Sequence, residues 1–282
     1  MEKTSVVTIG LPREQGDFLA RHTTFFERLP HLREAMDLAF IRTLHDSTLD
    51  NRAVFYLGRL CVEDFFEVIV LSGNGYGLGG LRLVRGMYER AITARYLHLH
   101  PGSAEQFMDY FWVTKHKESQ ALKETFGEAT IPKGDAEEVE RQFGRVREKF
   151  MVTDCKKCGT TRLNYTWSKL DFASMAKKVG SLGTLIVPAY YLPLEHGHST
   201  SAGIVFRLTG SEEMVSFKDE SHREEADSSL HLSHHILLDI LLLQQEHFAL
   251  SVLEEPIRTC FRDFVDIWEK RAAGTEVSPD SC

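Results

Sequence analysis

The amino-acid sequence predicts an all-α fold: an irregular multi-helix bundle with a central apolar helix near its C-terminus and a cysteine-containing insertion. Apolar residues recur at helical spacing through most of the chain, and no stretch shows sustained alternation of apolar and polar residues. Hydrophobic residues make up 43% of the 282 residues, which is enough to bury a continuous core without disulfides. We therefore expect a single helical domain over residues 1–272 and a disordered tail over residues 273–282.

The first half of the chain divides into four predicted helices. The first covers about residues 18–44 and is kinked or restarted at Pro30, because a proline inside a helix removes a backbone hydrogen bond. The second covers about residues 49–71, and a glycine-rich turn ends it. The third covers about residues 78–99 and carries an apolar stripe at every third or fourth position. The fourth covers about residues 103–126, and the serine at its start can cap it.

The second half of the chain is predicted to contain an insertion, a polar loop and further helices. The insertion surrounds two cysteines and has no clear periodicity, whereas the helix after the polar loop is nearly all apolar and should lie in the core. In order, these elements are an amphipathic helix at about 134–151, the insertion at 153–168, short helices from Asp171, Leu182 and His198, the loop at about 209–227, the core helix at about 228–250 and an amphipathic helix at about 254–271.

Composition and cysteine usage predict a soluble protein of the cytoplasm. The N-terminus has no apolar run of signal-peptide length, and the most apolar stretch, residues 236–243, is short and interrupted by Asp239. Five scattered cysteines differ from the dense, even set of a small secreted domain, so we expect reduced thiols. A formal net charge of −8 argues against a general nucleic-acid binder, whose affinity comes from neutralising phosphates. We expect no membrane partner.

One segment is basic inside this acidic protein. Residues 141–178 contain ten lysines and arginines against three acids, a local charge of 10 − 3 = +7. Four aromatic residues lie among these charges: Phe143, Phe150, Tyr165 and Trp167. This mixture suits a surface that contacts phosphates and stacks on bases, so RNA is one candidate partner. The alternative is a solvated helix and loop with ordinary core aromatics.

Residues 75–80, Gly-Tyr-Gly-Leu-Gly-Gly, fit the G-x-G-x-x-G pattern of dinucleotide-binding loops. The apolar run before them belongs to a helical pattern far longer than a strand, and no alternating strands and helices follow. Glycines between two antiparallel helices are explained by helix termination. We therefore expect no bound nucleotide and no other cofactor.

A second short motif separates Arg95 from His100 by four residues, the spacing associated with all-helical HEPN ribonucleases. Such a pair could polarise a phosphate and move protons. About three matches of this kind are expected by chance in a chain of this composition, and we find one. The motif is therefore a candidate catalytic site, but it does not by itself identify a ribonuclease.

Two groups of metal-ligating residues are weak candidates, and neither completes a metal site. Cys155 and Cys158 have the spacing of a zinc knuckle, but a closed site needs four ligands and no second pair follows. Neighbouring lysines would favour thiolates, so redox pairing is an alternative to two free thiols. His231, His235 and Asp239 fall at i, i+4 and i+8 on one face of the core helix. Polar contacts between helices are the favoured explanation, so no metal site is predicted.

A charged pair in the third predicted helix is more informative. Arg85 and Glu89 lie four residues apart within the apolar stripe, so we expect both to face the interior, where an ion pair needs polar partners. Such partners are concentrated in one later segment, at a break between apolar segments. They are Tyr191, Glu195, His196, His198 and Ser199. We expect these groups to frame a polar pocket; a structural lock between helices is the alternative.

These two stretches resemble the bacterial domain of unknown function 5677. The resemblance is carried by Leu-Val-Arg-Gly-Met-Tyr-Glu-Arg at 83–90 and by the segment 191–199, and it covers about residues 50–207. It implies an all-helical domain with an arginine and a glutamate on one helix and a later tyrosine-to-histidine element. Here these positions are Arg85, Glu89, Tyr191 and His198. Glu195 stands where the family pattern has a serine, so a hydroxyl role at that position is in doubt. The resemblance implies a fold class and no established reaction.

Three functions from different classes fit these residues. The first is a binding or regulatory module of the bacterial cytosol, built on the predicted polar pocket. The second is a metal-independent ribonuclease in stress or phage defence, with Arg95 and His100, or a site centred on His198, as catalytic groups and residues 141–178 as the RNA surface. The third is a metal-dependent hydrolase that uses some of His196, His198, His231 and His235. Whether the protein is an enzyme stays open, and its large helical faces are compatible with a homodimer.

Overall fold

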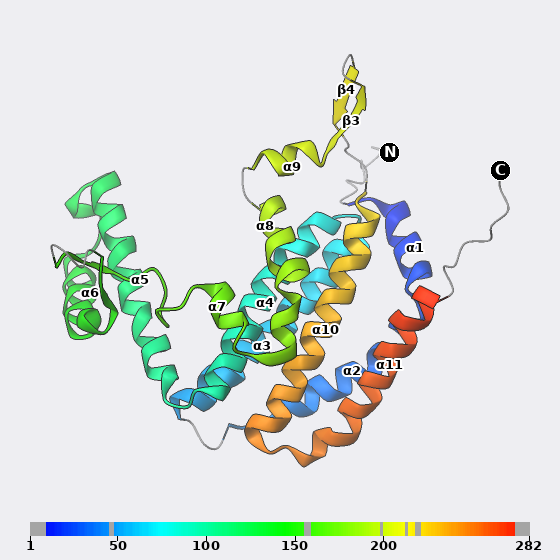
Figure 1. Ribbon diagram of the computed structural model, residues 1–282, viewed down its shortest axis with the longest axis horizontal. Helices are drawn as coiled ribbons and strands as arrows, with labels where there is room; N and C mark the ends of the chain where they lie inside the picture. Colours follow the sequence, from blue (N-terminus) through cyan, green and yellow to red (C-terminus); the bar gives the residue numbers. More distant parts are fainter. Residues whose placement is uncertain are drawn as a thin grey trace, which may run out of the picture.

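The computed structural model describes residues 10–44, 48–154, 159–197, 200–211, 214–217 and 221–273 of the chain. It confirms the predicted all-α fold, because helices make up most of the described residues (Figure 1). Within these ranges the strands form two short antiparallel hairpins at the periphery. The predicted tail lies outside the described residues from 274 onward.

The helices are α1 (Pro12–Arg21), α2 (Thr23–Phe40), α3 (Leu49–Gly73), α4 (Gly77–Leu99), α5 (Ser103–Phe126), α6 (Lys133–Val146), α7 (Phe172–Ala176), α8 (Leu192–Gly197), α9 (Ser201–Val205), α10 (Arg223–Phe248) and α11 (Glu254–Ala273). Short 3-10 turns are η1 (Glu128–Thr130), η2 (Arg147–Phe150), η3 (Gly180–Leu185) and η5 (Ser251–Leu253), and η4 (Val187–Tyr191) is a π-helical turn. Nowhere in the described ranges is a helix both long and apolar enough to cross a membrane.

Helices α3, α4 and α10 lie side by side and form the centre of the bundle (Figure 1). Their facing side chains are fully buried at Phe65 on α3, at Val84 and Ile92 on α4, and at Ile236 and Leu237 on α10. Helices α2 and α11 pack against each other and against α10. The core helix predicted near the C-terminus is therefore central, as its apolar composition indicated.

Glycines bring the start of α4 into direct contact with the start of α10. A Cβ atom at Gly77 would lie 2.2 Å from the carbonyl oxygen of His222 and 2.4 Å from the backbone nitrogen of Ala226. Three residues later, a Cβ atom at Gly80 would lie 2.7 Å from the hydroxyls of Ser72 and Ser229, which hydrogen-bond to each other. The G-x-G-x-x-G sequence thus follows a helix instead of a strand, and its glycines permit a close helix crossing.

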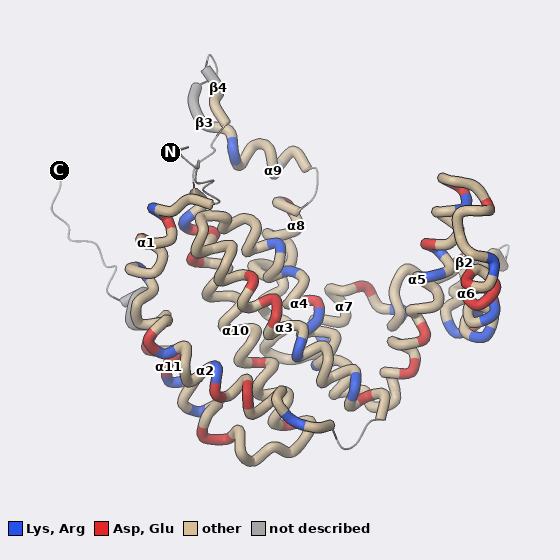
Figure 2. Tube along the Cα trace, turned by 180° about the vertical axis from the view of Figure 1, so that it is seen from behind, with Lys and Arg blue, Asp and Glu red and all other residues tan. Residues whose placement is uncertain are grey.

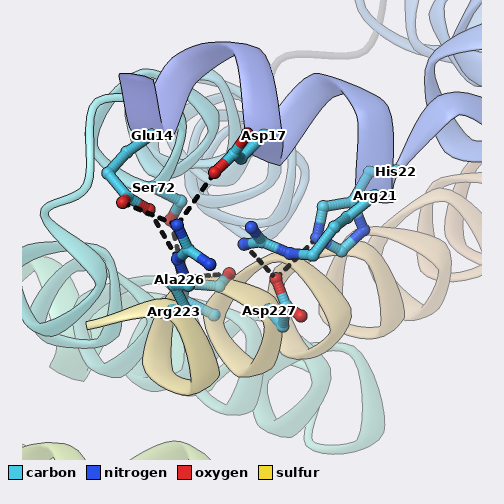
Figure 3. Close-up of polar contacts among 9 residues, drawn as sticks. Glu14, Asp17, Arg21, His22, Ser72, Arg223, Ala226 and Asp227 are labelled. Carbon is cyan, nitrogen blue, oxygen red and sulfur yellow. Dashed lines mark hydrogen bonds and ion pairs between the residues drawn. The ribbon is translucent and has the colours of Figure 1, made fainter. Parts of the chain in front are cut away.

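Helix α1 fixes the beginning of α10 from the other side (Figure 3). The guanidinium of Arg223 donates two hydrogen bonds of 2.9 Å to the two carboxylate oxygens of Glu14. One turn further along α10, Asp227 accepts hydrogen bonds from Arg21 at 3.1 Å and from the buried ring of His22, whose Nε2 lies 2.7 Å from the carboxylate. These charge-assisted contacts hold the first turns of α10 in place.

The outer half of α5 carries a satellite lobe with a small core of its own (Figure 1). Its buried residues are Val113, Phe143, Val146 and Phe150. Helix α6, the turn η2 and the hairpin of β1 (Met151–Thr153) and β2 (Thr161–Leu163) surround them. The predicted helix at 134–151 therefore ends earlier, and the predicted irregular insertion at 153–168 contains β2 and the last residue of β1. Residues 155–158, between the two strands, lie outside the described residues.

The predicted first helix, residues 18–44, is wrong in its boundaries. The chain forms two helices that meet at His22, whereas Pro30 lies inside α2. The reason for the break is tertiary, because the buried His22 side chain is bonded to Asp227 of α10.

The predicted polar loop at 209–227 is also wrong. Its first part pairs β3 (Leu208–Ser211) with β4 (Met214–Phe217), and its last part is the first turn of α10. The polar residues of this stretch resemble those of a loop, but acids such as Glu224 and Glu225 are also favoured in the first turn of a helix.

The tight crossing of α4 and α10 should be sensitive to a single methyl group. Gly77→Ala places that group against backbone atoms of α10, which cannot rotate away, so we expect the free energy of unfolding in urea to fall by at least about 2 kcal/mol. Gly79→Ala is the matched control, because the nearest atom to its Cβ would be Leu71 Cδ1 at 3.4 Å. That variant should be neutral or more stable by up to about 1 kcal/mol. Equal destabilisation by both substitutions would contradict the proposed role of Gly77.

Several histidines are enclosed within the bundle, and burial lowers the pKa of each. His98 and His247 approach each other with 3.0 Å between their Nδ1 atoms, and burial lowers the pKa of both. His234 accepts a hydrogen bond from Trp268 at 3.2 Å, and burial, with smaller contributions from His231 and His235, lowers its pKa to about 3. The folded chain therefore resists protonation at these rings, whereas the unfolded chain takes up protons below about pH 6.5.

Stability should decline as the pH falls below about 6.5. The unfolded state then binds more protons than the folded state, so the free energy of unfolding decreases toward the folded-state pKa values. Between about pH 7.5 and about pH 5.5, His234 alone should account for about 1.4 kcal/mol of this decrease. Urea titrations of wild type and His234→Gln at both pH values test this, and an unchanged pH dependence in the variant would rule out the contribution of His234.

Candidate functional site

A cavity of about 710 Å³ lies between α8, α9 and the N-terminal half of α10. We call it the α8–α10 cavity. Its apolar lining residues are Leu81, Leu185, Pro188, Leu192, Val205, Phe206 and Leu232. Its polar lining residues are Glu195, His196, Glu224, Glu225, Ser228, His231 and His235. An apolar concavity with a few convergent polar groups is the usual form of a small-molecule site.

Hydrogen bonds from α4 position the wall of the cavity that contains η4 and α8. The buried hydroxyl of Tyr88 donates to the backbone carbonyl of Leu182 at 3.1 Å, which fixes η3. The guanidinium of Arg82 donates from Nε and Nη2 to the carbonyl oxygen of His196, at 3.1 and 2.9 Å, which fixes the end of α8. Between these anchors, the π-helical turn η4 places Pro188 in the lining. Such turns are frequent at functional sites.

Helix α10 presents one polar face to the cavity. Glu224, Ser228, His231 and His235 follow one another at spacings of four, three and four, so they share a side of the helix. The ring of His231 also packs against Trp268 of α11, with 4.9 Å between ring centroids. Burial lowers the pKa of His231, and the neighbouring His235 lowers it further, so His231 is a neutral ring near pH 7.

The mouth of the cavity combines exposed apolar side chains with carboxylates. Phe206 is 46% exposed, and its ring centroid lies 4.6 Å from that of His196. Glu195 on α8 and Glu224 on α10 are exposed, and Glu225 is partly buried. Among the residues that the structure describes, no lysine or arginine lines this cavity. The polar groups therefore suit a positively charged ligand group better than an anion.

The predicted pair of Arg85 and Glu89 forms, but it does not face the interior as expected. Arg85 Nε donates to Glu89 Oε1 at 3.0 Å, and the two side chains are 24% and 42% exposed. The guanidinium also lies 4.8 Å from the ring centroid of Tyr190. Both residues lie at the edge of the buried stripe of α4, where long side chains reach solvent. They do not line the α8–α10 cavity, nor does the exposed Tyr191.

The structure brings together residues that the sequence presents as separate groups. Glu195 and His196 belong to the predicted polar segment, whereas His231 and His235 belong to the weak metal candidates. All four line the same cavity. His198 and Ser199, the remaining members of the polar segment, lie outside the described residues.

Arg95 and His100 have different partners. Arg95 forms an ion pair with Glu246 of α10, and its Nη2 donates to the carbonyl of Asp239 at 3.4 Å. His100 stacks on Tyr96, with 4.0 Å between ring centroids, and its Nδ1 lies 2.9 Å from the Tyr96 carbonyl. Each side chain is thus held by contacts of its own within the helix bundle.

Three cations of the basic segment 141–178, namely Arg141, Lys149 and Arg162, form ion pairs with nearby acids. Lys149 bonds to Glu105 and Asp109 of α5 at 2.7 and 2.6 Å, and Arg162 bonds to Asp154 at 2.8 Å. Its aromatic residues are also divided in role. Phe143 and Phe150 belong to the core of the satellite lobe, whereas Tyr165 is exposed beneath the Arg162 guanidinium. The local charge of the sequence therefore overstates the positive surface.

The metal candidates are only partly described. Cys155 and Cys158 lie outside the described residues, and Cys61 and Cys260 are buried free thiols. His235 Nε2 lies 3.6 Å from a carboxylate oxygen of Asp239, whose pKa is raised by burial. Within the described part of the chain, no three histidine, cysteine or acidic side chains are placed to hold a metal ion together.

Sequence reasoning missed two contributions to the cavity. Glu224 and Glu225 fell in the predicted loop at 209–227, although two adjacent acids followed by an apolar run are a signal for a helix start. Phe206 and Pro188 carried no recognisable signal, because their place in the lining depends on how α8 and α9 fold back over α10.

Comparison with known proteins connects this architecture to a family. A family model described as a family of unknown function, DUF5677, matches residues 51–214. No curated protein and no solved structure matches the chain. The matched range begins in α3 and ends at β4, so it contains Glu195 and His196 but not the cavity face of α10. Because the match covers more than half of the chain, the chain belongs to this family of unknown function, DUF5677.

Proposed function

We propose that the chain is a binding or regulatory module whose α8–α10 cavity holds a small molecule with an apolar body and a cationic amine. One observation carries the proposal: three carboxylates and three histidines gather on a lining whose other residues are apolar except Ser228, and whose described residues include no lysine or arginine. The apolar side chains would bury the apolar body of the ligand, and the carboxylates would accept hydrogen bonds from its cationic amine.

The carboxylates come from two elements, which favours a ligand that bridges them. Glu195 belongs to α8, whereas Glu224 and Glu225 belong to the first turn of α10. Glu224 and Glu225 both lie at the positive end of the α10 helix dipole, where acidic side chains are favoured. A cation between the two helices would relieve the repulsion among these like charges.

The histidines support the same ligand class. His231 has a lowered pKa and adds no positive charge near pH 7, so it does not repel a cation. A neutral ring can accept a hydrogen bond from an ammonium group. The module would work in the bacterial cytosol, in keeping with the free thiols Cys61 and Cys260, since reducing conditions preserve thiols.

Simple amphiphiles test this proposal, with n-octylamine, n-octanol and n-octanoate as probes. We expect n-octylamine to bind at least about fivefold more tightly than n-octanol, because an ion pair at a partly exposed site is worth about 1 kcal/mol. The anion n-octanoate should bind most weakly. Isothermal titration calorimetry at pH 7 gives the three dissociation constants, and equal affinities for all three probes would argue against a cation site.

Charge-neutralising variants locate the binding at this cavity. Glu195→Gln and Glu224→Gln should each weaken n-octylamine binding while leaving n-octanol binding unchanged. Glu128→Gln on η1 is the matched control, because it removes the same charge from an exposed side chain outside the cavity lining. If the control weakens n-octylamine binding as much as the cavity variants do, the effect reflects net charge and the site is misplaced.

The two enzymatic alternatives draw less support from the geometry. Arg95 and His100 are held by different partners, and acids pair with Lys149 and Arg162 of the basic segment. The hydrolase would need His196, His231 or His235 to bind a metal with further ligands, one of which, His198, lies outside the described residues. RNA cleavage that His100→Ala abolishes in a folded protein would overturn the binding proposal in favour of the ribonuclease.

A further inference from the structure

Helix α3 has one exposed face along most of its length. We call it the outer face of α3. It consists of Arg52, Tyr56, Arg59, Leu60, Glu63, Phe66, Glu67 and Val70. These residues recur at spacings of three and four, so they form a single stripe on the side opposite the contacts with α4 and α10. Figure 2 shows the molecule from the side on which this face of α3 lies.

Half of the residues of the outer face are apolar, which is unusual for a helix face that is exposed to solvent. Tyr56 is 58% exposed, Leu60 41%, Phe66 37% and Val70 61%. A groove beside the stripe is lined by α2 as well, and Ile41 at the end of α2 is 77% exposed. Several exposed apolar side chains gathered on one helix face mark a protein interaction surface.

The order of residues on the outer face is symmetric about Glu63. Leu60 and Phe66 lie three positions before and after Glu63, and both are apolar. Arg59 and Glu67 lie four positions before and after it, and their charges are opposite. Tyr56 and Val70 lie seven positions before and after it, and again both are apolar. Reversing the helix therefore places apolar residues on apolar ones and Arg59 on Glu67, whereas Arg52 lies outside this symmetric set.

We infer that a second copy of this chain covers the outer face, through an antiparallel two-fold contact between the α3 helices centred on Glu63. In this contact Leu60 meets the partner's Phe66, Tyr56 meets the partner's Val70, and Arg59 pairs with the partner's Glu67. A two-fold interface requires a self-complementary surface, and the pattern about Glu63 has that property. An unrelated partner would place no such symmetry on the sequence of α3.

Electrostatics agree with self-association at this face. The outer face carries two arginines and two glutamates and is therefore neutral (+2 − 2 = 0), although the chain has a net charge of −8. The two Glu63 side chains would approach each other at the axis. Arg59 Nη1 lies 3.5 Å from Glu63 Oε1 within one chain, and it would also reach the partner's Glu67, so both carboxylates share its charge.

A charge-reversal cycle on the full-length chain tests the pairing. Sedimentation velocity over about 1 to about 200 µM protein should show reversible dimerisation of wild type, because a contact built mainly on one helix pair is small. Arg59→Glu and Glu67→Arg should each raise the dimer dissociation constant at least about tenfold, since each places like charges opposite each other twice. The double variant Arg59→Glu/Glu67→Arg restores both pairs and should return to within about threefold of wild type.

Both positions changed in this cycle, Arg59 and Glu67, are on the surface, so the variants should fold, and circular dichroism checks that they do. Arg258→Glu is the control, because it reverses an exposed charge on α11, away from α3. A wild-type chain that stays monomeric overturns the inference. So does a dimer that Arg59→Glu leaves intact, or a double variant that is as weak as the single ones.

Discussion

The close crossing of α4 and α10 is the constraint on which the rest of the bundle depends. Gly77 lets the backbone of α10 approach α4 within a distance that a Cβ would prevent, and Gly80 leaves room for the side chains of Ser72 and Ser229. The Ser72–Ser229 hydrogen bond satisfies both hydroxyls inside this contact. Because α4 also carries Leu81 and Arg82, the crossing determines where the cavity begins and where α8 is anchored.

Helix α10 serves the core and the cavity at the same time. Leu230, Ile236 and Leu237 are buried among the central helices, while His231 and His235 on a neighbouring side line the cavity. His234, on the same helix, is buried against Phe25 and Trp268 and accepts a hydrogen bond from Trp268. Core residues, the buried His234 and the cavity-lining histidines therefore all belong to one helix.

Charge is distributed unevenly over the molecule, and its local balance matters more than the total. The cavity mouth is acidic, the outer face of α3 is neutral, and Lys149 of the basic segment pairs with Glu105 and Asp109 of α5. A net charge of −8 or a local sequence charge of +7 therefore says little about any one surface. Pairing between elements that are distant in sequence decides which charges remain available to a partner.

The sequence by itself determined the helical class, the central position of the apolar helix after residue 228 and the structural nature of the glycine-rich turn. These features depend on local periodicity and on backbone conformation, which neighbouring residues specify. The sequence also singled out Glu195, His196, His231 and His235, but only as members of separate motifs. The tertiary structure decided that these four residues share one cavity and that the partly exposed Arg85 and Glu89 do not line it. It also decided that the helix break falls at His22. Those outcomes depend on contacts between segments far apart in the chain, such as Arg82 with His196 and His22 with Asp227, which no local pattern encodes.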